Sequence, residues 1–284
     1  MPILRASEWI SLLAFSGFAV LAWRRDLDRV RRIKIAGIGA GGLAFTLFAP
    51  LILPSLRAPH GSAIARDCIP CALLLLFYSQ SGQFVTRVDR RIEAHLEQLD
   101  QRWIAPRLEW CARLPFGAWV FTFLELAYLS YYVSIPLAVG ALYWFGRERK
   151  ADYLWTVVLL AAYGSCSLLP FIQTRPPRMV GEKWSACLPC GKVRAFNLWI
   201  LRHGSIQANT FPSAHVAIAT AGAFAFFGIG PAWIAWSFLG LAIGVALGAV
   251  AGRYHYGADA VLGLIVAAAA LLSGAALAAC GVIG

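Results

Sequence analysis

Residues 211–260 read FPSAHVAIATAGAFAFFGIGPAWIAWSFLGLAIGVALGAVAGRYHYGADA, and this stretch decides which kind of fold the chain adopts. It holds two apolar runs, 212–229 and 231–251, each of the length that a helix needs to cross a membrane. Polar islands, 212–215 and 253–259, stand at the ends of these runs. Ionisable side chains at such positions are costly and mark function by default. The stretch therefore predicts membrane-spanning helices with a functional site at one end.

The composition extends this prediction to the whole chain. Of its 284 residues, 60% are hydrophobic and 14% are charged, whereas a soluble domain has about 25% charged residues. We therefore expect an integral membrane protein. The net charge of +11 suggests anionic lipid headgroups or topology signals, and no pattern for binding nucleic acid is visible.

Apolar runs outside this stretch supply further helices. The run 68–78 is short for a span and fits a re-entrant, interfacial or marginal helix. The run 8–23 lacks a small-residue cleavage site, so we interpret it as an anchor and not as a removed signal peptide. The other runs cover residues 35–54, 116–145, 153–172 and 259–280. The predicted fold class is all-α, a polytopic transmembrane helical bundle.

Residues 87–104 differ from these runs because their apolar residues are widely spaced. The residues at helical spacing are Val88, Ile92, Leu96, Leu99 and Trp103, with charged and amide side chains between them. This pattern predicts an amphipathic helix along the membrane surface. A solvated helix packed on the bundle is the alternative.

The positions of the basic residues bear on topology. The loop 145–152 and the segment 24–34 both look cytoplasmic by the positive-inside rule. The two assignments agree only if residues 68–85 do not fully cross the membrane. Since the loop 145–152 places residues 173–211 on the opposite face, we expect a plasma (inner) membrane protein with its site on the extracytoplasmic face.

Two of the polar islands carry acid–base groups. His255 and Asp259, four residues apart, share one face of a helix, and a carboxylate on one ring nitrogen leaves the other nitrogen free to attack. His215, one turn into an apolar helix, would protonate a leaving oxygen. The plainer interpretations are a polar pair at a helix end and a satisfied core histidine.

Four further residues suit an anion. Ser213 begins a span, where a helix N-terminus can hold a phosphate, although serine there is also a natural N-cap. Arg175, Arg178 and Arg253 stand at the ends of spans, and guanidinium forks match the oxygens of a phosphoryl group. Snorkelling to headgroups is the alternative for any single arginine.

Together these residues resemble the type 2 phosphatidic acid phosphatase superfamily, which includes the lipid phosphate phosphatases and vanadium haloperoxidases. That family's pattern is Lys, six residues, Arg-Pro; then Pro-Ser-Gly-His; then Ser-Arg, five residues, His, three residues, Asp. Here Arg175-Pro176, the island 212–215 with Ala for Gly, and His255 with Asp259 match it. The resemblance covers about residues 116–280 and implies a six-helix phosphatase-type core.

The chain departs from the pattern at two positions. Leu168 stands at the place of the family's Lys, and Ala249 at that of its second Arg. Arg253 is the available substitute, and Arg178 rivals Arg175 for the first phosphate contact. This looser pattern is also similar to the inositol phosphorylceramide and sphingomyelin synthase branch.

The resemblance implies a lipid phosphate phosphatase that hydrolyses a phosphomonoester or pyrophosphate of a lipid. His255 would attack phosphorus and form a phosphohistidine, Asp259 would orient His255, and His215 would protonate the leaving alkoxide and then activate water. The phosphate-binding residues would be Arg175, Arg178, Ser213 and Arg253. No metal or other cofactor is implied, and the expected partner is a phospholipid or isoprenoid-lipid phosphate.

We expect one integral membrane domain, with residues 1–110 as N-terminal helices and the amphipathic helix, and residues 111–284 as the catalytic core. The main alternative is a lipid phosphotransferase, which would use the same His-His-Asp site to pass the phosphoryl group to a second alcohol. A non-catalytic lipid-binding or scaffold protein is a third interpretation. A haloperoxidase does not fit the membrane-spanning composition.

Overall fold

The computed structural model describes residues 4–53, 59–180 and 191–283, and these residues form helices and connecting segments without a strand. The all-α class is thus confirmed. The helices, in chain order, are α1 (Ala6–Arg24), α2 (Arg29–Ile52), α3 (Pro59–Gly82), α4 (Arg90–Trp103), α5 (Ala105–Arg113), α6 (Gly117–Trp144), η2 (Glu148–Lys150), α7 (Ala151–Cys166), η3 (Pro177–Met179), α8 (Lys192–Gly204), α9 (Ala214–Ile229), α10 (Ala232–Ala251) and α11 (Gly257–Ala279).

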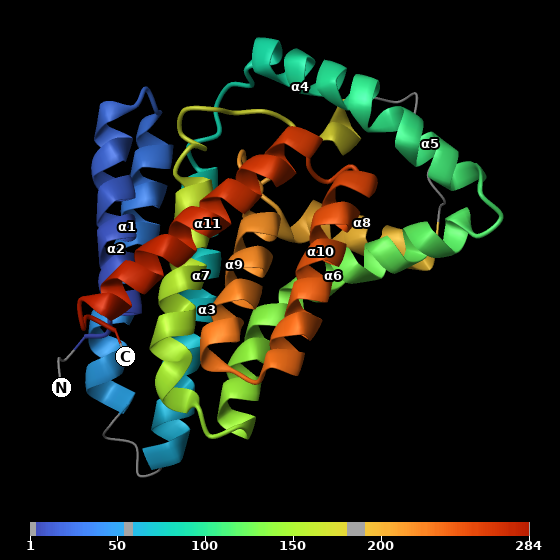
Figure 1. The fold of residues 1–284 in the computed structure, drawn as a ribbon. Helices are drawn as coiled ribbons and strands as arrows, with labels where there is room; N and C mark the ends of the chain where they lie inside the picture. The colour runs from blue at the N-terminus through green and yellow to red at the C-terminus, as the bar shows by residue number, and fades with distance from the viewer. Residues whose placement is uncertain (1–3, 54–58, 181–190, 284) are drawn as a thin grey trace.

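The central helix is α9, which packs against α7, α10 and α11 (Figure 1). It is buried on nearly all sides, as its apolar sequence predicts. Small residues such as Ala217 and Ala221 let the neighbouring helices approach closely. Gly263 of α11 marks the closest approach, because a Cβ atom there would lie 2.8 Å from the carbonyl oxygen of Ser213.

Four helix ends meet at one end of this bundle, beneath α4 (Figure 1). Here α7 and α10 finish, and α9 and α11 begin. The Ser213 hydroxyl caps α9 by accepting the Val216 N–H, while the Ser213 N–H donates to the Asp259 carbonyl at 3.0 Å. Thr174 and Asn209 pair as an isolated antiparallel bridge. These contacts bring together three polar islands, residues 174–178, 212–215 and 253–259, that lie apart in the sequence.

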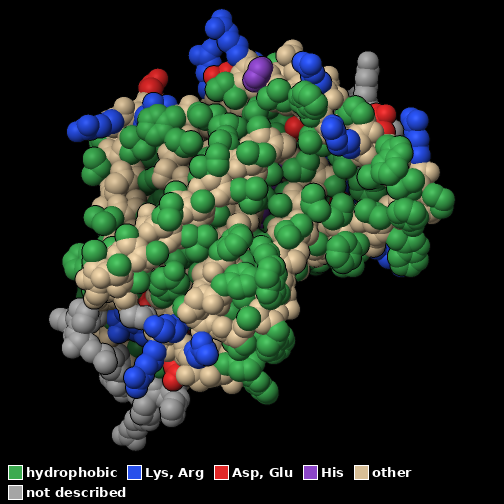
Figure 2. All heavy atoms as spheres, in the orientation of Figure 1, with side chains coloured by type: hydrophobic (Ala, Val, Ile, Leu, Met, Phe, Trp, Pro, Cys, Tyr) green, Lys and Arg blue, Asp and Glu red, His purple; other side chains and the backbone are tan. Residues whose placement is uncertain are grey.

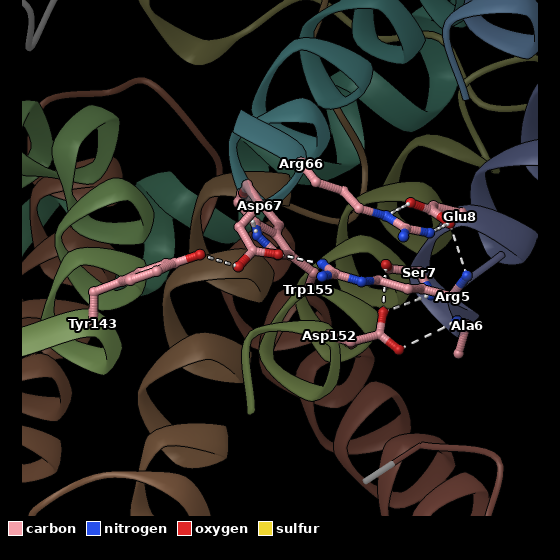
Figure 3. Close-up of polar contacts among 9 residues, drawn as sticks. All are labelled: Arg5, Ala6, Ser7, Glu8, Arg66, Asp67, Tyr143, Asp152 and Trp155. Atoms are coloured by element: carbon pink, nitrogen blue, oxygen red, sulfur yellow. Dashed lines mark hydrogen bonds and ion pairs between the residues drawn. The ribbon is translucent and has the colours of Figure 1, made fainter. Parts of the chain in front are cut away.

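The third helix differs from the short helix expected over residues 68–78. Its span covers Gly61–Gly82, because polar residues in its first half have partners. Arg66 forms a bidentate ion pair with Glu8 of α1, and Asp67 pairs with Arg5 (Figure 3). The charges that interrupt the apolar pattern are thus neutralised inside the bundle, so the helix extends through them.

The length of α3 changes the topology argument. Because it is long enough to cross a membrane, the segment 24–34 and the loop 147–150 lie at opposite ends of the bundle (Figure 1). The two basic segments could both be cytoplasmic only if residues 68–85 did not cross the membrane. Since the two segments lie at opposite ends of the bundle, at most one of them is cytoplasmic.

Two other segments between the spans are now defined. The amphipathic helix expected over residues 87–104 is found as α4, and α5 follows it. Residues 173–211 lie between two apolar runs of the sequence, and their described part contains η3 and α8. Cys68 and Cys71 are free thiols, whereas the Cys187 and Cys190 pair lies outside the described residues.

The surface matches a membrane environment. Within the described residues, six helices are long and apolar enough to span, and Figure 2 shows hydrophobic side chains between two ends where Lys and Arg gather. Trp119 and Trp144, at opposite ends of α6, are 80% and 85% exposed. Exposed tryptophans at both ends are typical of the two membrane–water interfaces. The chain is therefore an integral membrane protein.

Candidate active site

A chain of polar contacts links the two predicted histidines. His215 Nδ1 lies 3.2 Å from His255 Nε2, and His255 Nδ1 lies 3.5 Å from Asp259 Oδ2. On the other side, the Tyr128 hydroxyl lies 3.4 Å from His215 Nε2. One tautomer assignment fits these contacts: Tyr128 donates to His215, and His215 donates to His255, whose Nδ1–H then faces Asp259 without a hydrogen bond. His255 Nε2 then carries a lone pair and can act as a nucleophile.

The carboxylate of Asp259 is fixed from several directions. Its Oδ2 accepts the Asn209 amide at 2.8 Å and the Tyr256 N–H at 3.0 Å. Asn209 in turn bonds the Thr174 hydroxyl at 3.1 Å. Sequence reasoning missed Asn209, and the only available signal was a polar residue close before the island 212–215.

His255 lies in the short connection between α10 and α11 and is 4% exposed. Burial, together with the positive charge of Arg178, lowers the pKa of His255 to about 3. The imidazole is therefore neutral at physiological pH, which is the protonation state that a nucleophile requires. The backbone N–H of His255 donates to the Ala249 carbonyl at 3.0 Å.

Arg178 is the cation that acts on both histidine rings. Among the described residues its guanidinium has no hydrogen-bond or ion-pair partner, although the side chain is half-buried. Burial lowers the pKa of Arg178, yet a guanidinium stays charged in proteins. A partly buried, unpaired cation is costly and suits an anionic ligand.

Arg175 and Arg253 differ from Arg178 because both have carboxylate partners on α4. Arg175 forms a bidentate pair with Glu93, whose oxygens lie 2.6 and 3.0 Å from its nitrogens. The Arg253 Nη2 lies 3.2 Å from a Glu97 oxygen and donates to the Pro177 carbonyl at 2.9 Å. The fold therefore brings all the predicted site residues to one region but gives the arginines different surroundings.

The model of the PAP2 superfamily matches residues 85–273. The chain belongs to the PAP2 superfamily. Neither a curated protein nor a solved structure matches it significantly. Membership supports a phosphoesterase hydrolase of the lipid phosphatase type.

This PAP2 superfamily member departs from the resembled pattern in ways that its fold accommodates. Leu168, at the place of the pattern's Lys, is 39% exposed. Ala249, at the place of the second Arg, is fully buried, and its carbonyl accepts the N–H groups of Tyr254 and His255. Within the described residues, no group of three His, Cys, Asp or Glu side chains could hold a metal ion.

An apolar groove of about 260 Å³ ends at His215. The aromatic residues that line it are Phe77, Tyr78, Tyr131, Tyr132 and Tyr163. A smaller cavity of about 130 Å³ shares five of its lining residues and continues toward Ile135 and Pro136 of α6. The groove reaches lipid-facing surface, since Leu75 is 65% exposed and Tyr132 is 41% exposed. Sequence reasoning missed these residues because apolar spans carry aromatic residues throughout.

A second buried network supports the connection that carries His255. Glu125 of α6 accepts hydrogen bonds from Arg194 at 2.7 Å, Asn197 at 2.6 Å and the Tyr254 hydroxyl at 2.5 Å. Tyr254 also stacks on Tyr128, with ring centroids 4.2 Å apart. This network ties α6 and α8 to the residue directly before the proposed nucleophile.

Proposed function

We propose that the chain is a membrane-embedded lipid phosphate phosphatase that works through a phosphohistidine intermediate. The observation that carries this proposal is the pair of linked histidines, which feel the charge of the unpaired Arg178 and of which His215 lines an apolar groove. The groove suits a hydrocarbon chain, and the cation suits the phosphate attached to it.

The reaction has two steps. His255 Nε2 forms a bond to phosphorus as the bond from phosphorus to the lipid oxygen breaks, and His215, which takes up a proton when the anionic substrate binds, gives that proton to the lipid oxygen and becomes neutral. His215 then takes a proton from water, whose oxygen attacks phosphorus and releases phosphate from His255. Because His215 Nδ1 and His255 Nε2 are 3.2 Å apart in the structure, the phosphoryl group must enter between these two nitrogens.

Arg178 is assigned the main phosphate contact. The contacts predicted for Arg175, Arg253 and Ser213 stay predictions, and each of these side chains has a protein partner in the fold. Asp259 keeps the proton on His255 Nδ1 and so keeps Nε2 free for attack.

A screen for phosphate release tests the function. The purified chain in detergent micelles is given phosphatidic acid, phosphatidylglycerol phosphate, a polyprenyl phosphate or diphosphate, and a sphingolipid phosphate. We expect phosphate release from one class, inhibition by orthovanadate, which mimics five-coordinate phosphorus, and no loss of activity with EDTA.

Three variants complete this test. His255→Ala, His215→Ala and Asp259→Asn should each lower turnover by at least about 10²-fold, without loss of fold. Near-normal activity of His255→Ala would exclude the covalent mechanism. A new phospholipid in place of free phosphate would identify the phosphotransferase alternative.

We also propose that the site faces the extracytoplasmic side of the plasma membrane. The basic loop 147–150, at the other end of the bundle, supports this orientation by the positive-inside rule. The basic segment 24–34 lies at the site's end, but three of its arginines, Arg25, Arg31 and Arg32, have structural partners. Arg25 donates to the Pro170 carbonyl, and Arg31 donates to the carbonyls of Gln83 and Val85.

A further inference from the structure

The inward face of α4 carries carboxylates. Glu93, Glu97 and Asp100 are 3%, 9% and 4% exposed, although α4 is a polar helix on the outside of the bundle. They lie three or four residues apart, so they share one face of the helix with Leu96. Acidic side chains are rarely buried unless they are paired, so each of these carboxylates is expected to have a partner.

Glu93 is paired with the first polar island. It accepts the side chain of Arg175 in bidentate geometry and also the Arg175 backbone N–H at 3.0 Å. Burial alone would raise the pKa of Glu93, but the hydrogen bonds from Arg175 outweigh it and the pKa is lowered. The pair is therefore ionised, and the place of Arg175 is fixed in both backbone and side chain.

Glu97 is paired with the third island. Its oxygens lie 3.2 and 3.3 Å from Nη2 of Arg253, which is almost fully buried. Arg253 has a φ of 59°, a conformation that non-glycine residues adopt only where the surroundings enforce it. The Arg253 carbonyl accepts the Arg178 N–H at 3.0 Å, so this contact joins the two islands.

Asp100 acts on the same island through the backbone. Its Oδ1 accepts the Gly257 N–H at 3.0 Å, at the first residue of α11. Gly257 lies two residues after His255 and two before Asp259. The helix α4 therefore contacts Arg175, three residues before Arg178. It also contacts Arg253 and Gly257, which stand on either side of His255.

We propose that Glu93, Glu97 and Asp100 are positioning residues for the reaction. They hold segments 175–178 and 253–257 so that Arg178 and His255 meet the same phosphate. Arg175 and Arg253 serve as counter-ions of α4 and do not bind the substrate. The inference rests on the proposed function, since it assigns these roles within the same site.

A charge exchange separates positioning from phosphate binding. Glu93→Gln and Arg175→Gln should each lower kcat about tenfold with KM changed less than about threefold, because displacement of Arg178 misaligns the reacting groups. The double variant Glu93→Arg with Arg175→Glu restores the ion pair and should recover most of kcat. If Arg175 binds phosphate directly, the exchange places a carboxylate against the substrate, and the double variant stays inactive, which would overturn the proposal.

Asp100 allows a conservative comparison. Asp100→Asn keeps an oxygen that can accept the Gly257 N–H and should keep kcat, whereas Asp100→Ala loses it and should lower kcat about tenfold. Equal loss in both variants would contradict the role assigned to Asp100. Glu109→Gln on α5 is the control, since Glu109 has its partner Arg113 on the same helix and should leave kcat unchanged.

Amide hydrogen exchange of the full chain in micelles gives a readout that needs no turnover. Glu93→Gln should speed amide exchange in residues 174–178, and Asp100→Ala should speed it in residues 254–259. The double variant Glu93→Arg with Arg175→Glu, and Asp100→Asn, should each exchange at the rate of the unchanged chain. If no lipid phosphate is hydrolysed but these changes occur, the proposed function fails and the positioning contacts stand. If exchange in both segments is unchanged, the positioning role of α4 is excluded.

Discussion

Arg178 is the residue on which the site's chemistry depends most. Its backbone N–H donates to the Arg253 carbonyl. Its charge acts on His215 and His255 and on two tyrosines of the groove, Tyr78 and Tyr132. Neighbouring Arg175 has the family's Arg-Pro context but is paired with Glu93. The arginine at the motif position, Arg175, is therefore not the arginine whose charge is left without a partner, which is Arg178.

We predict that Arg178→Gln lowers kcat/KM about 10²-fold, because it removes the charge that stabilises the phosphoryl group in the transition state. Arg178→Lys should recover only part of this loss, since an ammonium lacks the planar fork. Initial rates on the lipid found in the screen measure both. Arg202→Gln, an exposed arginine of α8, is the control, and equal effects at both positions would remove the special role of Arg178.

The buried His255 also predicts how stability depends on pH. Its pKa is about 3 in the folded chain, against an ordinary value of 6.5, because of burial and the charge of Arg178. The unfolded chain therefore takes up a proton between pH 6.5 and 3 that the folded chain does not. This contribution to stability is present above pH 6.5 and is lost as the pH falls, with a limiting slope of about 1.4 kcal/mol per pH unit.

Thermal unfolding in micelles between pH 4 and pH 8 tests this dependence. His255→Gln should flatten the acid limb of the profile, because it removes the titrating group. The matched control is His95→Gln, since His95 lies exposed on α4. A profile of His255→Gln that parallels that of the unchanged chain would contradict a neutral, buried His255.

At the scale of elements, a polar cluster fastens the N-terminal helices to the core. It lies at the end of the bundle away from the histidines and joins α1, α3, α6 and α7 (Figure 3). The N–H groups of Ala6 and Ser7 donate to Asp152, and the Tyr143 hydroxyl donates to Asp67 at 2.6 Å. Asp152 thereby caps the start of α1 from a different helix.

We predict that breaking one ion pair of this cluster loosens α1 without altering the chemistry. Glu8→Gln leaves Arg66 without its bidentate partner in a half-buried place and should lower stability by about 3 kcal/mol. The exchange Glu8→Arg with Arg66→Glu should recover most of the loss. Unfolding in increasing SDS measures this, and kcat at low temperature should stay unchanged.

Arg24→Gln provides the control for this experiment. Arg24 is an exposed arginine at the opposite end of α1 and should not change stability. If Glu8→Gln is as stable as Arg24→Gln, the cluster does not anchor α1.

At the scale of the whole molecule, the two ends of the bundle differ in chemistry. The histidine end carries the basic segment 24–34, α4 and α8, whereas the other end carries the loop 147–150 and the ion-paired cluster (Figure 1). An apolar band separates them (Figure 2). Leu75 and Tyr132 of the groove are exposed on this band, so under the proposed function a lipid substrate would reach His215 from within the membrane.

We predict that the histidine end is extracytoplasmic. In a variant without native cysteines, Gly191→Cys should react with an impermeant maleimide in intact cells, and Arg149→Cys should react only after lysis. Both positions are exposed and lie at opposite ends of the bundle. The reverse labelling pattern would place the site in the cytoplasm and would make the segment 24–34 the dominant topology signal.

The sequence alone determined the features that depend on local order. Apolar runs fixed most of the spans, since hydropathy and length suffice to place a helix in a membrane. The spacing of His255 and Asp259 predicted that the two side chains lie close together, and they are 3.5 Å apart, but His255 stands in the connection before α11 and not on a helix face shared with Asp259. The three polar islands could be assigned to one site because an even number of crossings separates them.

Only the tertiary structure decided which charges are paired. Glu93 and Arg175 lie 82 positions apart, and Glu97 and Arg253 lie 156 apart, so no local pattern shows that α4 occupies two of the three arginines. The same reason explains the length of α3, whose Arg66 and Asp67 interrupt the apolar run until Glu8 and Arg5 neutralise them. A charge's role depends on its partner, and partners are chosen by the packing of distant segments.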